Sequence, residues 1–413
     1  MQIRLALAFL LIACAAPAQK VTAVRFAKLW DGEKTIDRPL VVIEGSRIRS
    51  VQAGEPAAPS GAEVVDWSRY YGLPGLIDVH THMTYISDQP GRIARGGNRM
   101  AAVTVFLAQE NARKSLEAGV TTVRDLGSSE YTDIAMRDLI NRGAMLGPRM
   151  FVCGYGITIG GSFRPGSNPQ PGPGTADSPD QVAQVVRRMI AAGADVIKMY
   201  GSVGGFENVN TQQTFTYEEM KAAVDVAHLM GKKIAIHSYG PEGGRDAVRA
   251  GADSLEHAVD LDDATLAEMV RRKTYYVPTI DHNRYYVDAA ADYNFRAGSV
   301  DQLNAYIARN FETAKRAWKA GVRFAMGSDA VYTMFGKNTR ELGWFVKAGM
   351  TPEQALKTAT VNAADLLGQS ADLGSATAGH YADLIAVEGD PLADISVAIE
   401  KVRGVMKSGV VVK

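Results

Sequence analysis

Six side chains that can bind a metal ion or act as a base are spread along the chain: His80, His82, Lys198, His237, His257 and Asp329. His80 and His82 are separated by one residue, and in a β-strand residues with this spacing face the same side. Two imidazoles on one side of a strand can therefore bind one metal ion, for which zinc is a common choice. A metal centre is the first hypothesis, provided that the fold brings the other four side chains to the same place.

The elements that carry these residues alternate between strand and helix patterns from about residue 72 to residue 368, which predicts a parallel sheet. Eight strands are expected, at Leu76–His82, Val120–Leu126, Arg149–Gly154, Asp195–Tyr200, Lys233–Tyr239, Asp253–Ala258, Thr274–Ile280 and Val322–Asp329. Eight such units over this length predict an α/β fold of the (β/α)8 TIM-barrel type. The candidate residues lie at or near the carboxyl ends of their strands, which is the face on which TIM barrels carry their active sites.

Helix patterns between the strands agree with a barrel. The segments 181–192 and 217–230 each place apolar residues on one face, and Thr216 with Glu219 has the spacing of a capping box. Ala-Gly pairs precede four of the strands, with glycines at 119, 193, 251 and 321. A glycine at this point suits the left-handed residue that ends a helix.

Short β patterns flank the barrel on both sides. They occur at Val21–Phe26, Leu40–Glu44 and Arg47–Val51, and return at Ala382–Glu388, Val402–Met406 and Val410–Val412. We expect the two chain ends to pair as a small β-sandwich. The expected organisation is a signal peptide at 1–18, the first part of the sandwich at 19–71, the metallohydrolase barrel at 72–369 and the second part of the sandwich at 370–413.

The first residues have the pattern of an export signal. One positive charge precedes an apolar run from Leu5 to Ala16, which is too short for a permanent membrane helix, and the A-P-A sequence at 16–18 fits a cleavage site. The alternative is a lipoprotein, because the segment 11–14 resembles a lipidation box that ends at Cys14. Both interpretations predict a periplasmic or secreted protein, and no later apolar run predicts a transmembrane span in the mature chain.

Composition excludes several other classes. The 413 residues include 45 basic and 45 acidic ones, so the formal net charge is zero, which argues against a nucleic-acid partner bound through phosphates. Two cysteines cannot form a disulfide framework in a chain of this size. The chain contains no G-x-S-x-G motif of a serine hydrolase and no complete dinucleotide fingerprint. A small-molecule substrate is the expected partner, and homo-oligomer formation stays open.

Five motifs occur in order along the chain: Y-G-L-P-G-L-I-D-V-H-T-H at 71–82, D-V-I-K at 195–198, I-H-S-Y at 236–239, S-L-E-H at 254–257 and G-S-D at 327–329. Together they resemble the metal-dependent amidohydrolase superfamily, over nearly the whole mature chain. The A-D-L-I sequence at 382–385 is similar to the strand that returns to the sandwich of this family. The H-S-Y motif and the region 254–261 resemble in particular the Xaa-Pro dipeptidase and carboxypeptidase-like branch, which includes ochratoxin-hydrolysing enzymes.

The resemblance implies two divalent metal ions, usually Zn²⁺. His80, His82 and Asp329 would bind the more buried ion, His237 and His257 would bind the other, and Lys198 would bridge both as a carbamate formed with carbon dioxide. Elementary chemistry agrees, because a lysine ammonium would repel two cations whereas its carbamate is an anion with oxygen ligands. A lysine at this strand also argues against the mononuclear deaminase type.

The implied reaction is hydrolysis of an amide or peptide bond by a metal-bound hydroxide. Asp329 would act as the general acid and base, taking a proton from the nucleophile and passing it to the leaving amine. Tyr239 lies two residues after His237, so it faces the same way and could stabilise the oxyanion. The expected substrate is a dipeptide or an N-acyl amino acid, with ochratoxin-like amides included.

A substrate of this kind needs a group that binds its carboxylate. The candidates are Arg284 and His282, just beyond the seventh strand, and Arg164 in a long loop rich in glycine and proline after the third strand. In the same loop Ser162 stands where many relatives have a histidine that contacts substrate, and this departure weakens the inference of a peptide preference. His228 and His380 are interpreted as structural.

Two alternatives stay open at the level of sequence. The same site could serve a phosphotriesterase or lactonase, because fold alone does not decide the reaction. The other alternative, a non-catalytic exported barrel, is disfavoured because every ligand position of the family is kept. Turnover of dipeptides compared with phosphotriesters and lactones would separate the first, and metal analysis the second.

Overall fold

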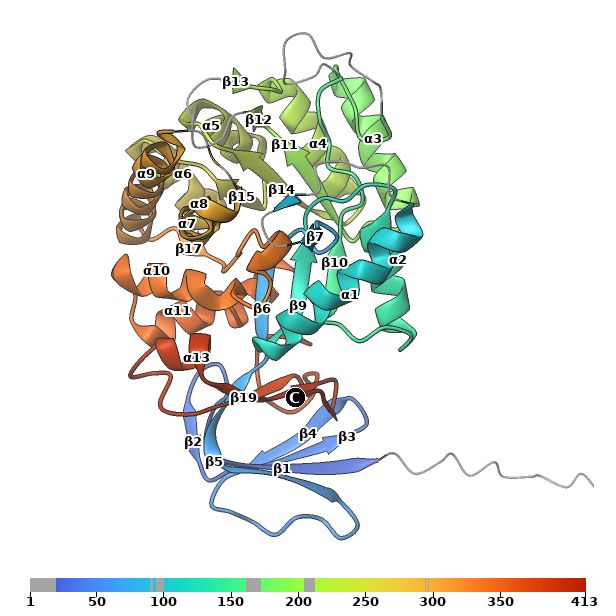
Figure 1. Cartoon of the computed structure of the whole chain (residues 1–413), viewed down its shortest axis with the longest axis vertical. Coiled ribbons are helices and arrows are strands. Elements are labelled where there is room, and N and C mark those ends of the chain that lie inside the picture. Colours follow the sequence, from blue (N-terminus) through green and yellow to red (C-terminus); the bar gives the residue numbers. More distant parts are fainter. Residues whose placement is uncertain are drawn as a thin grey trace, which may run out of the picture.

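The computed structural model describes residues 20–89, 92–93, 100–160, 172–203, 212–293, 295 and 297–413. The expected signal peptide with Cys14 lies outside the described residues, as do the two loop candidates Ser162 and Arg164. The barrel occupies the upper part of Figure 1, and a β-sheet made by both ends of the chain lies below it.

All eight expected barrel strands are present. They are β6 (Leu76–Thr81), β9 (Val120–Asp125), β10 (Arg149–Val152), β11 (Val196–Tyr200), β14 (Lys233–Ser238), β15 (Ser254–His257), β16 (Tyr275–Val277) and β17 (Arg323–Phe324). Their ladders are parallel and fall into two groups, in the order β10-β9-β6 and β11-β14-β15-β16-β17. The (β/α)8 prediction is therefore confirmed.

Backbone hydrogen bonds outside the named ladders cross both junctions between the two groups of strands. Ile157 N donates to Lys198 O at 2.8 Å between the β10 and β11 sides, and Val79 N donates to Met326 O at 2.9 Å between the β6 and β17 sides. The last expected strand is shorter than predicted because the chain changes partners after Phe324, as when Met326 N donates to Thr358 O. At the same junction Asp329 N donates to His80 O at 2.7 Å, which brings two candidate ligands together.

Helices surround the barrel. They are α1 (Ala101–Glu117), α2 (Thr132–Asn141), α3 (Pro179–Ala191), α4 (Tyr217–Leu229), α5 (Pro241–Ala250), α6 (Asp263–Arg272), α7 (Ile280–Asp288), α8 (Ala290–Tyr293), α9 (Ser299–Ala320), α10 (Glu341–Lys347), α11 (Pro352–Thr358), α12 (Val361–Leu366) and α13 (Ser396–Glu400). The capping box of Thr216 and Glu219 is formed at the start of α4. The four predicted helix-ending glycines all have positive φ, between 85° and 104°.

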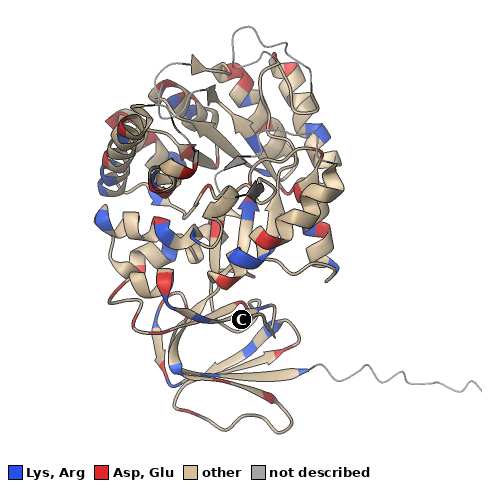
Figure 2. Ribbon diagram, in the orientation of Figure 1, with Lys and Arg blue, Asp and Glu red and all other residues tan. Residues whose placement is uncertain are grey.

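Short elements complete the described rim and its connections. They are β7 (Ser87–Gln89), β8 (Arg92–Ile93), β12 (Ser202–Val203), β13 (Gln212–Gln213), η1 (Tyr332–Met334) and η2 (Asn338–Arg340). Within the described residues no helix has the length and apolar content needed to cross a membrane. Acidic and basic residues are mixed over the helices on the face shown in Figure 2.

The two chain ends pair as predicted, but they do so in one eight-stranded sheet that curls on itself. Its strands are β1 (Val21–Trp30), β2 (Thr35–Asp37), β3 (Leu40–Glu44), β4 (Arg47–Gln52), β5 (Glu63–Pro74), β18 (Leu384–Val387), β19 (Val402–Lys407) and β20 (Val410–Val411). The antiparallel pair β5 and β18 joins the two ends, with Leu73 opposite Ile385. β5 runs past the expected boundary at residue 71 and leads through Gly75 into β6.

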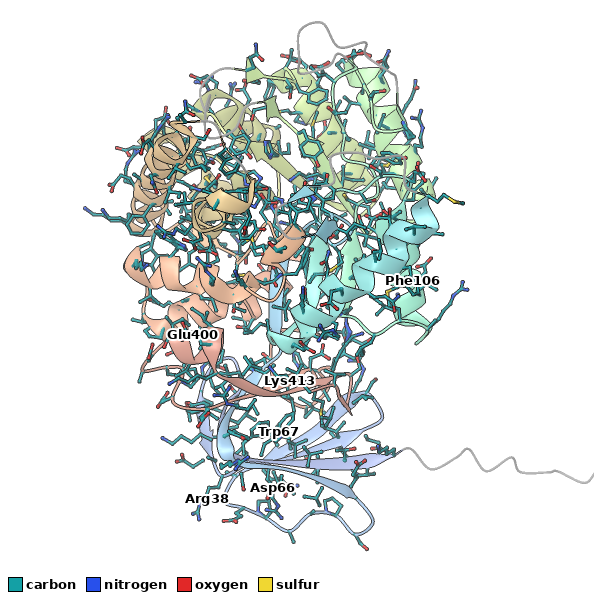
Figure 3. All side chains as sticks on the ribbon, in the orientation of Figure 1. Arg38, Asp66, Trp67, Phe106, Glu400 and Lys413 are labelled. Carbon is teal, nitrogen blue, oxygen red and sulfur yellow. The ribbon has the colours of Figure 1, made fainter. Side chains whose placement is uncertain are left out.

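The sheet curls around a core to which both ends contribute. Ile48 N donates to His380 O at 2.9 Å, so β4 at one edge of the sheet lies beside the segment that precedes β18. The enclosed core contains Phe26 and Trp67, with ring centroids 5.5 Å apart, and Met406 from the other end of the chain. Trp67 is labelled in Figure 3 within this sheet.

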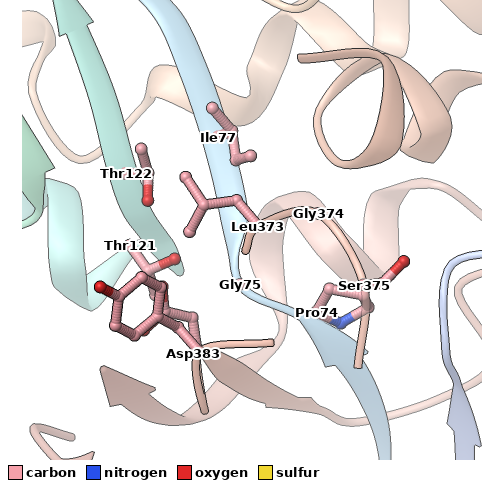
Figure 4. A pocket seen from close by; sticks show the side chains of 10 residues that line it. Pro74, Gly75, Ile77, Thr121, Thr122, Leu373, Gly374, Ser375 and Asp383 are labelled. Carbon is pink, nitrogen blue, oxygen red and sulfur yellow. The ribbon is translucent and has the colours of Figure 1, made fainter. Parts of the chain in front are cut away.

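A cavity of about 10 Å³ lies where the barrel meets the curled sheet (Figure 4). The hydroxyls of Thr121 and Thr122 line it, and both are buried without a hydrogen-bond partner among the described residues. Asp383, from the segment before β18, lines it beside Thr121, and Leu373 lies across from them. The volume is close to the minimum for one water molecule, which could bond the two hydroxyls.

Candidate metal centre

The barrel brings all six candidate side chains to one place at the carboxyl ends of its strands. His80 and His82 come from β6 and the residue that follows it, Lys198 from β11, His237 from β14, His257 from β15, and Asp329 from the segment after β17. Their residues are between 0% and 8% exposed, so the site is shielded from bulk water. Nearly 250 positions of sequence separate the first residue from the last, and only barrel closure makes them neighbours.

Asp329 is the centre of this arrangement. Its Oδ1 lies 3.2 Å from His82 Nε2 and 3.6 Å from His80 Nε2, and its Oδ2 lies 4.0 Å from His257 Nδ1. One ligand atom from each of His80, His257 and Asp329 can be chosen so that all lie within 4.8 Å of one another. Lys198 Nζ lies 3.5 Å from His80 Nε2, on the same side.

Three of the histidines use Nδ1 in hydrogen bonds to fixed groups. His80 Nδ1 lies 2.7 Å from Glu256 Oε2, His82 Nδ1 lies 3.2 Å from the Gly127 carbonyl, and His257 Nδ1 lies 2.7 Å from Thr279 Oγ1. A hydrogen bond at one ring nitrogen fixes the orientation of the ring and leaves the other nitrogen for a metal ion. These contacts therefore prepare three imidazoles as ligands.

His237 lies among aromatic rings on the other side of the site. Its ring centroid is 4.5 Å from that of His257, 4.5 Å from that of Tyr239 and 5.6 Å from that of Tyr200. Tyr239 also stacks on His257 at 5.2 Å, so the tyrosine points into the rim as strand alternation predicts. Burial raises the pKa of Tyr239, which keeps its hydroxyl protonated and able to donate a hydrogen bond.

Burial also changes the protonation of the nitrogen groups. It lowers the pKa of His80 to about 4 and holds the pKa values of His237 and His257 well below their usual range, with the Lys198 charge acting in the same direction. Burial lowers the pKa of Lys198 to about 8. Neutral imidazoles are the form that binds metal ions, and a neutral amine is the form that reacts with carbon dioxide.

Asp329 behaves in the opposite way. Burial by itself would raise the pKa of this carboxyl, but the neighbouring His282 and His80 and the hydrogen bond with His82 outweigh that effect and hold the pKa well below its usual value. His282, a predicted substrate contact, has Nδ1 2.8 Å from the Asp329 carbonyl and 3.5 Å from its Oδ2. His282 therefore belongs to the same cluster.

Three residues of the site have the left-handed backbone that L-residues rarely adopt. The φ angles are 72° at His257, 50° at Thr279 and 52° at Asp329. Such angles concentrate at functional sites, where surrounding structure holds them. Neighbouring residues of a regular strand point to opposite sides, but the positive φ at His257 interrupts this alternation. The side chains of Glu256 and His257 can therefore both point toward the site.

Several residues of the site were missed by the sequence interpretation. Asp78 accepts hydrogen bonds from Ser328 N at 2.9 Å and Asn338 Nδ2 at 2.9 Å, and so connects β6 with the Asp329 segment. Arg124 and Glu256 form a buried ion pair with Nη2 and Oε1 2.9 Å apart. The sequence did contain a sign of these residues, because each is a charged residue within a strand of the expected barrel, and that strand is fully buried. Asp78 is also two residues before His80, so it faces the same side of β6 as His80 and His82.

Arg284, another predicted substrate contact, is not brought to the cluster by any described contact. Its guanidinium bonds Asp288, with Nε to Oδ1 2.8 Å, and it lines a separate surface pocket with Arg340 and Trp344. The two histidines interpreted as structural lie elsewhere: His228 Nε2 contacts Asp253 Oδ2 at 2.8 Å and His380 Nδ1 contacts Thr377 Oγ1 at 3.0 Å.

The residues present fit a divalent metal centre. Nitrogen ligands with their second nitrogen already bonded, together with a buried aspartate held as an anion, are the donor set that zinc-like ions prefer. The distance of 3.5 Å between Lys198 Nζ and His80 Nε2 also fits a metal centre. Neutral imidazoles do not stabilise a buried ammonium, whereas the carbamate of Lys198 would be an anion that can bind metal ions. His80, His257 and Asp329 form the candidate site in its most compact form.

Comparisons with known proteins agree with this geometry. A model of the amidohydrolase family matches residues 71–412. Ochratoxinase from Aspergillus niger is 30% identical to the chain over 351 residues, which cover 79% of this chain and 72% of that protein. The crystal structure of that enzyme has a TM-score of 0.83 at 28% identity and covers 96% of each chain.

Two further solved structures are similar over nearly the whole length. A Xaa-Pro dipeptidase with bound methionine in its active site is 32% identical, with a TM-score of 0.87, and covers 95% of this chain and 100% of its own. A prolidase complexed with N-methylphosphonate-L-proline is 26% identical, with a TM-score of 0.86 and the same two coverages.

Proposed function

Because the chain belongs to the amidohydrolase family and is a hydrolase of amide or peptide bonds, we propose that it cleaves dipeptides or N-acyl amino acids that leave an amino acid with a free carboxylate. The observation that carries this proposal is the cluster of four histidines, Lys198 and Asp329 in a chain similar to a dipeptidase and to ochratoxinase. The ligands named for the two peptidase structures, methionine and a proline derivative, both contain an amino-acid carboxylate.

The proposed centre holds two divalent ions, with Zn²⁺ the first choice. His80, His82 and Asp329 would bind one, His237 and His257 the other, and Lys198 would connect them as its carbamate. Such ions supply Lewis-acid activation of the substrate carbonyl and of a water molecule. The support for this assignment is the convergence of these side chains and the lowered pKa values that burial gives His80, His237 and His257.

Asp329 is the proposed proton carrier. Its carboxylate is an anion at neutral pH and lies within 3.2 Å to 4.0 Å of three histidines, so it can accept the proton of the attacking water and deliver it to the departing amine. Tyr239 is the proposed donor to the oxyanion, because its protonated hydroxyl belongs to a ring that stacks on His257.

His282 is the proposed contact for the substrate's carboxylate among the described residues. It lies beside Asp329 and packs edge-on against Tyr286, with ring centroids 4.9 Å apart. Ser162, Arg164 and Arg284 remain predictions for the same role. Export remains a proposal too, and it would place such an enzyme among extracellular peptides.

A substrate screen tests the proposal. The metal-loaded full-length protein is assayed against libraries of dipeptides and N-acyl amino acids, with the matching C-terminal amides, a phosphotriester and lactones as controls. We expect turnover of the free acids and at least about tenfold less for the amides, because the carboxylate contact is lost. Faster hydrolysis of phosphotriesters or lactones than of any amide would contradict the proposal.

A further inference from the structure

A buried charged network connects three barrel strands beneath the metal centre. It contains Arg124 on β9, Glu256 on β15 and His80 on β6, and each residue is 1% exposed or less. Arg124 Nη2 donates to Glu256 Oε1 at 2.9 Å, and Glu256 Oε2 lies 2.7 Å from His80 Nδ1. The Glu256 carboxylate therefore connects the guanidinium of Arg124 with the candidate metal ligand His80.

The network determines which nitrogen of His80 carries its proton. A carboxylate that is already bonded by a guanidinium acts as an acceptor, so His80 Nδ1 must be the donor. The lone pair of Nε2 is then free, and Nε2 faces Lys198 Nζ at 3.5 Å and Asp329 Oδ1 at 3.6 Å. The tautomer that Glu256 selects is the one that can bind a metal ion in the centre.

His80 differs in this respect from the other two histidines with a described Nδ1 contact. His82 uses a backbone carbonyl and His257 a threonine hydroxyl, and both partners are neutral. A charged acceptor makes the imidazole a stronger ligand than a neutral one does. His80 is therefore singled out as the most strongly polarised of these three ligands.

Arg124 is fixed as firmly as Glu256. Its Nε donates to the Val79 carbonyl at 2.5 Å and its Nη1 to Ser254 Oγ at 3.0 Å, so the guanidinium spans from β6 to β15. Arg124 therefore fixes the oxygen of Glu256 that does not contact His80. The three contacts of Arg124 thus hold Glu256 in its orientation.

We propose that Arg124 and Glu256 are positioning residues for the metal centre, with Glu256 holding His80 in the tautomer that binds the more buried ion and Arg124 holding Glu256. The inference rests on the metal centre of the proposed function and adds two residues that touch neither metal nor substrate. The competing explanation is an ion pair that only stabilises the barrel.

The experiment measures zinc affinity of the purified full-length enzyme, by elemental analysis of the isolated protein and by competition with a chromophoric chelator. Glu256→Gln keeps the shape, but its amide must turn an N–H toward either Arg124 or His80. The double variant Arg124→Met with Glu256→Leu removes both charges, so no unpaired ion remains in the core. Arg137→Met, which breaks a partly buried ion pair with Asp195 (2.8 Å), is the matched control.

We expect both Glu256 variants to bind Zn²⁺ about 10- to 100-fold more weakly than the wild type, and Arg137→Met to bind it unchanged. The double variant should also keep a thermal midpoint close to that of the wild type, while its kcat falls. Wild-type zinc affinity in the double variant would overturn the inference, because it would show that only the unpaired charge mattered. The metal content of the wild type is measured first. If the wild type contains and binds no metal ion, the metal centre of the proposed function is refuted, independently of the variants.

Discussion

Among single residues, the chemistry of the site depends on how burial away from water changes the protonation of a few side chains. Burial lowers the pKa values of His80, His237 and His257 and lowers that of Lys198 to about 8, so that these residues can serve as ligands. Asp329 stays an anion in the same environment because its contacts with His282, His80 and His82 outweigh the effect of its burial. Desolvation thus favours the neutral form of both kinds of group, and only at Asp329 do neighbouring groups overcome it.

Replacement of the bridging candidate is the most informative single change. Lys198→Ala should reduce turnover by at least about a hundredfold, since the anion proposed to connect both ions is lost. A short carboxylic acid such as propionate should restore part of the activity by taking the place of the carbamate. Steady-state kinetics with and without the acid measure this, and Lys221→Ala on the exposed side of α4 is the control.

Full activity of Lys198→Ala in the absence of added acid would show that Lys198 does not connect the two ions. The variant could also lose activity because it does not fold, which circular dichroism would show. Recovery of activity with the added acid would exclude this explanation, because the acid can restore only a folded enzyme.

The residues of the candidate centre could largely be predicted from sequence, whereas their supporting contacts could not. Six residues were recognisable because each lies at or near the end of a strand of the expected barrel: His80, His82, Lys198, His237, His257 and Asp329. Arg124 and Glu256 lie inside strands, and nothing local shows that two such residues of β9 and β15 will meet below His80. Ion pairs that cross a barrel depend on strand tilt and on register, which a single sequence does not display.

At the scale of elements, the strands were predictable because their apolar runs lie between clear helix ends, and the helix-ending glycines were predictable because only glycine adopts positive φ without strain. The length of β17 was not predictable, since its chain shares hydrogen bonds with neighbours on both sides after Phe324. The sequence predicted that the two chain ends pair, but not that their strands form one continuous sheet.

Close contact between β6 and the segment after β17 requires Gly327. A Cβ atom at this position would lie 2.5 Å from Val277 Cγ1 and 2.7 Å from His80 Cβ, so the strands would have to separate. Gly327→Ala should cost about 1–3 kcal/mol of unfolding free energy and lower kcat by displacing His80. Denaturant unfolding and kinetics measure both, with Gly343→Ala in α10 as the control, since its nearest neighbour would be 3.7 Å away. Unchanged stability would show that the strands are not packed as described.

The junction of α10 with α7 should make stability depend on pH. Glu341 is buried and accepts hydrogen bonds from Ile280 N and Asp281 N at the start of α7. Burial raises its pKa to about 8 from the ordinary 4.5, so the folded state binds a proton that the unfolded state releases. The stability linked to this group is complete below about pH 4.5 and is lost as the pH rises toward 8.

Thermal midpoints of Glu341→Gln across pH 4.5 to 8 should therefore decline less than those of the wild type, although the variant is less stable at low pH because its amide can accept only one of the two hydrogen bonds. Glu353→Gln, at a partly exposed carboxylate of α11, serves as the control. Parallel curves for the wild type and Glu341→Gln would mean that Glu341 is ionised throughout.

At the scale of the whole molecule, the barrel and the curled sheet share one continuous strand path. β5 pairs with β1 and with β18 in the sheet, and Gly75 alone separates it from β6 of the barrel. The apolar core of the barrel also includes residues of the C-terminal strands, such as Ile385 and Val405. The two parts therefore stabilise each other.

We expect the full-length protein to unfold in one calorimetric transition, and a chain that ends at residue 383 to lose the folded barrel as well, because it lacks β18, β19 and β20. Calorimetry of the full chain and circular dichroism of the shortened one provide the measurements. Two separate transitions, or a shortened chain with a native spectrum and activity, would show that the barrel folds independently.

Side chains from β6, β11, β14 and β15 and from the segments after β6 and β17 meet in one candidate metal centre for amide hydrolysis. Elemental analysis of active preparations, combined with dipeptide turnover before and after removal of metal by a chelator, is the decisive measurement of its role. We expect close to two divalent ions per chain, loss of turnover as they are removed, and recovery when Zn²⁺ is returned with bicarbonate. Undiminished dipeptide hydrolysis by a preparation free of metal would contradict this expectation.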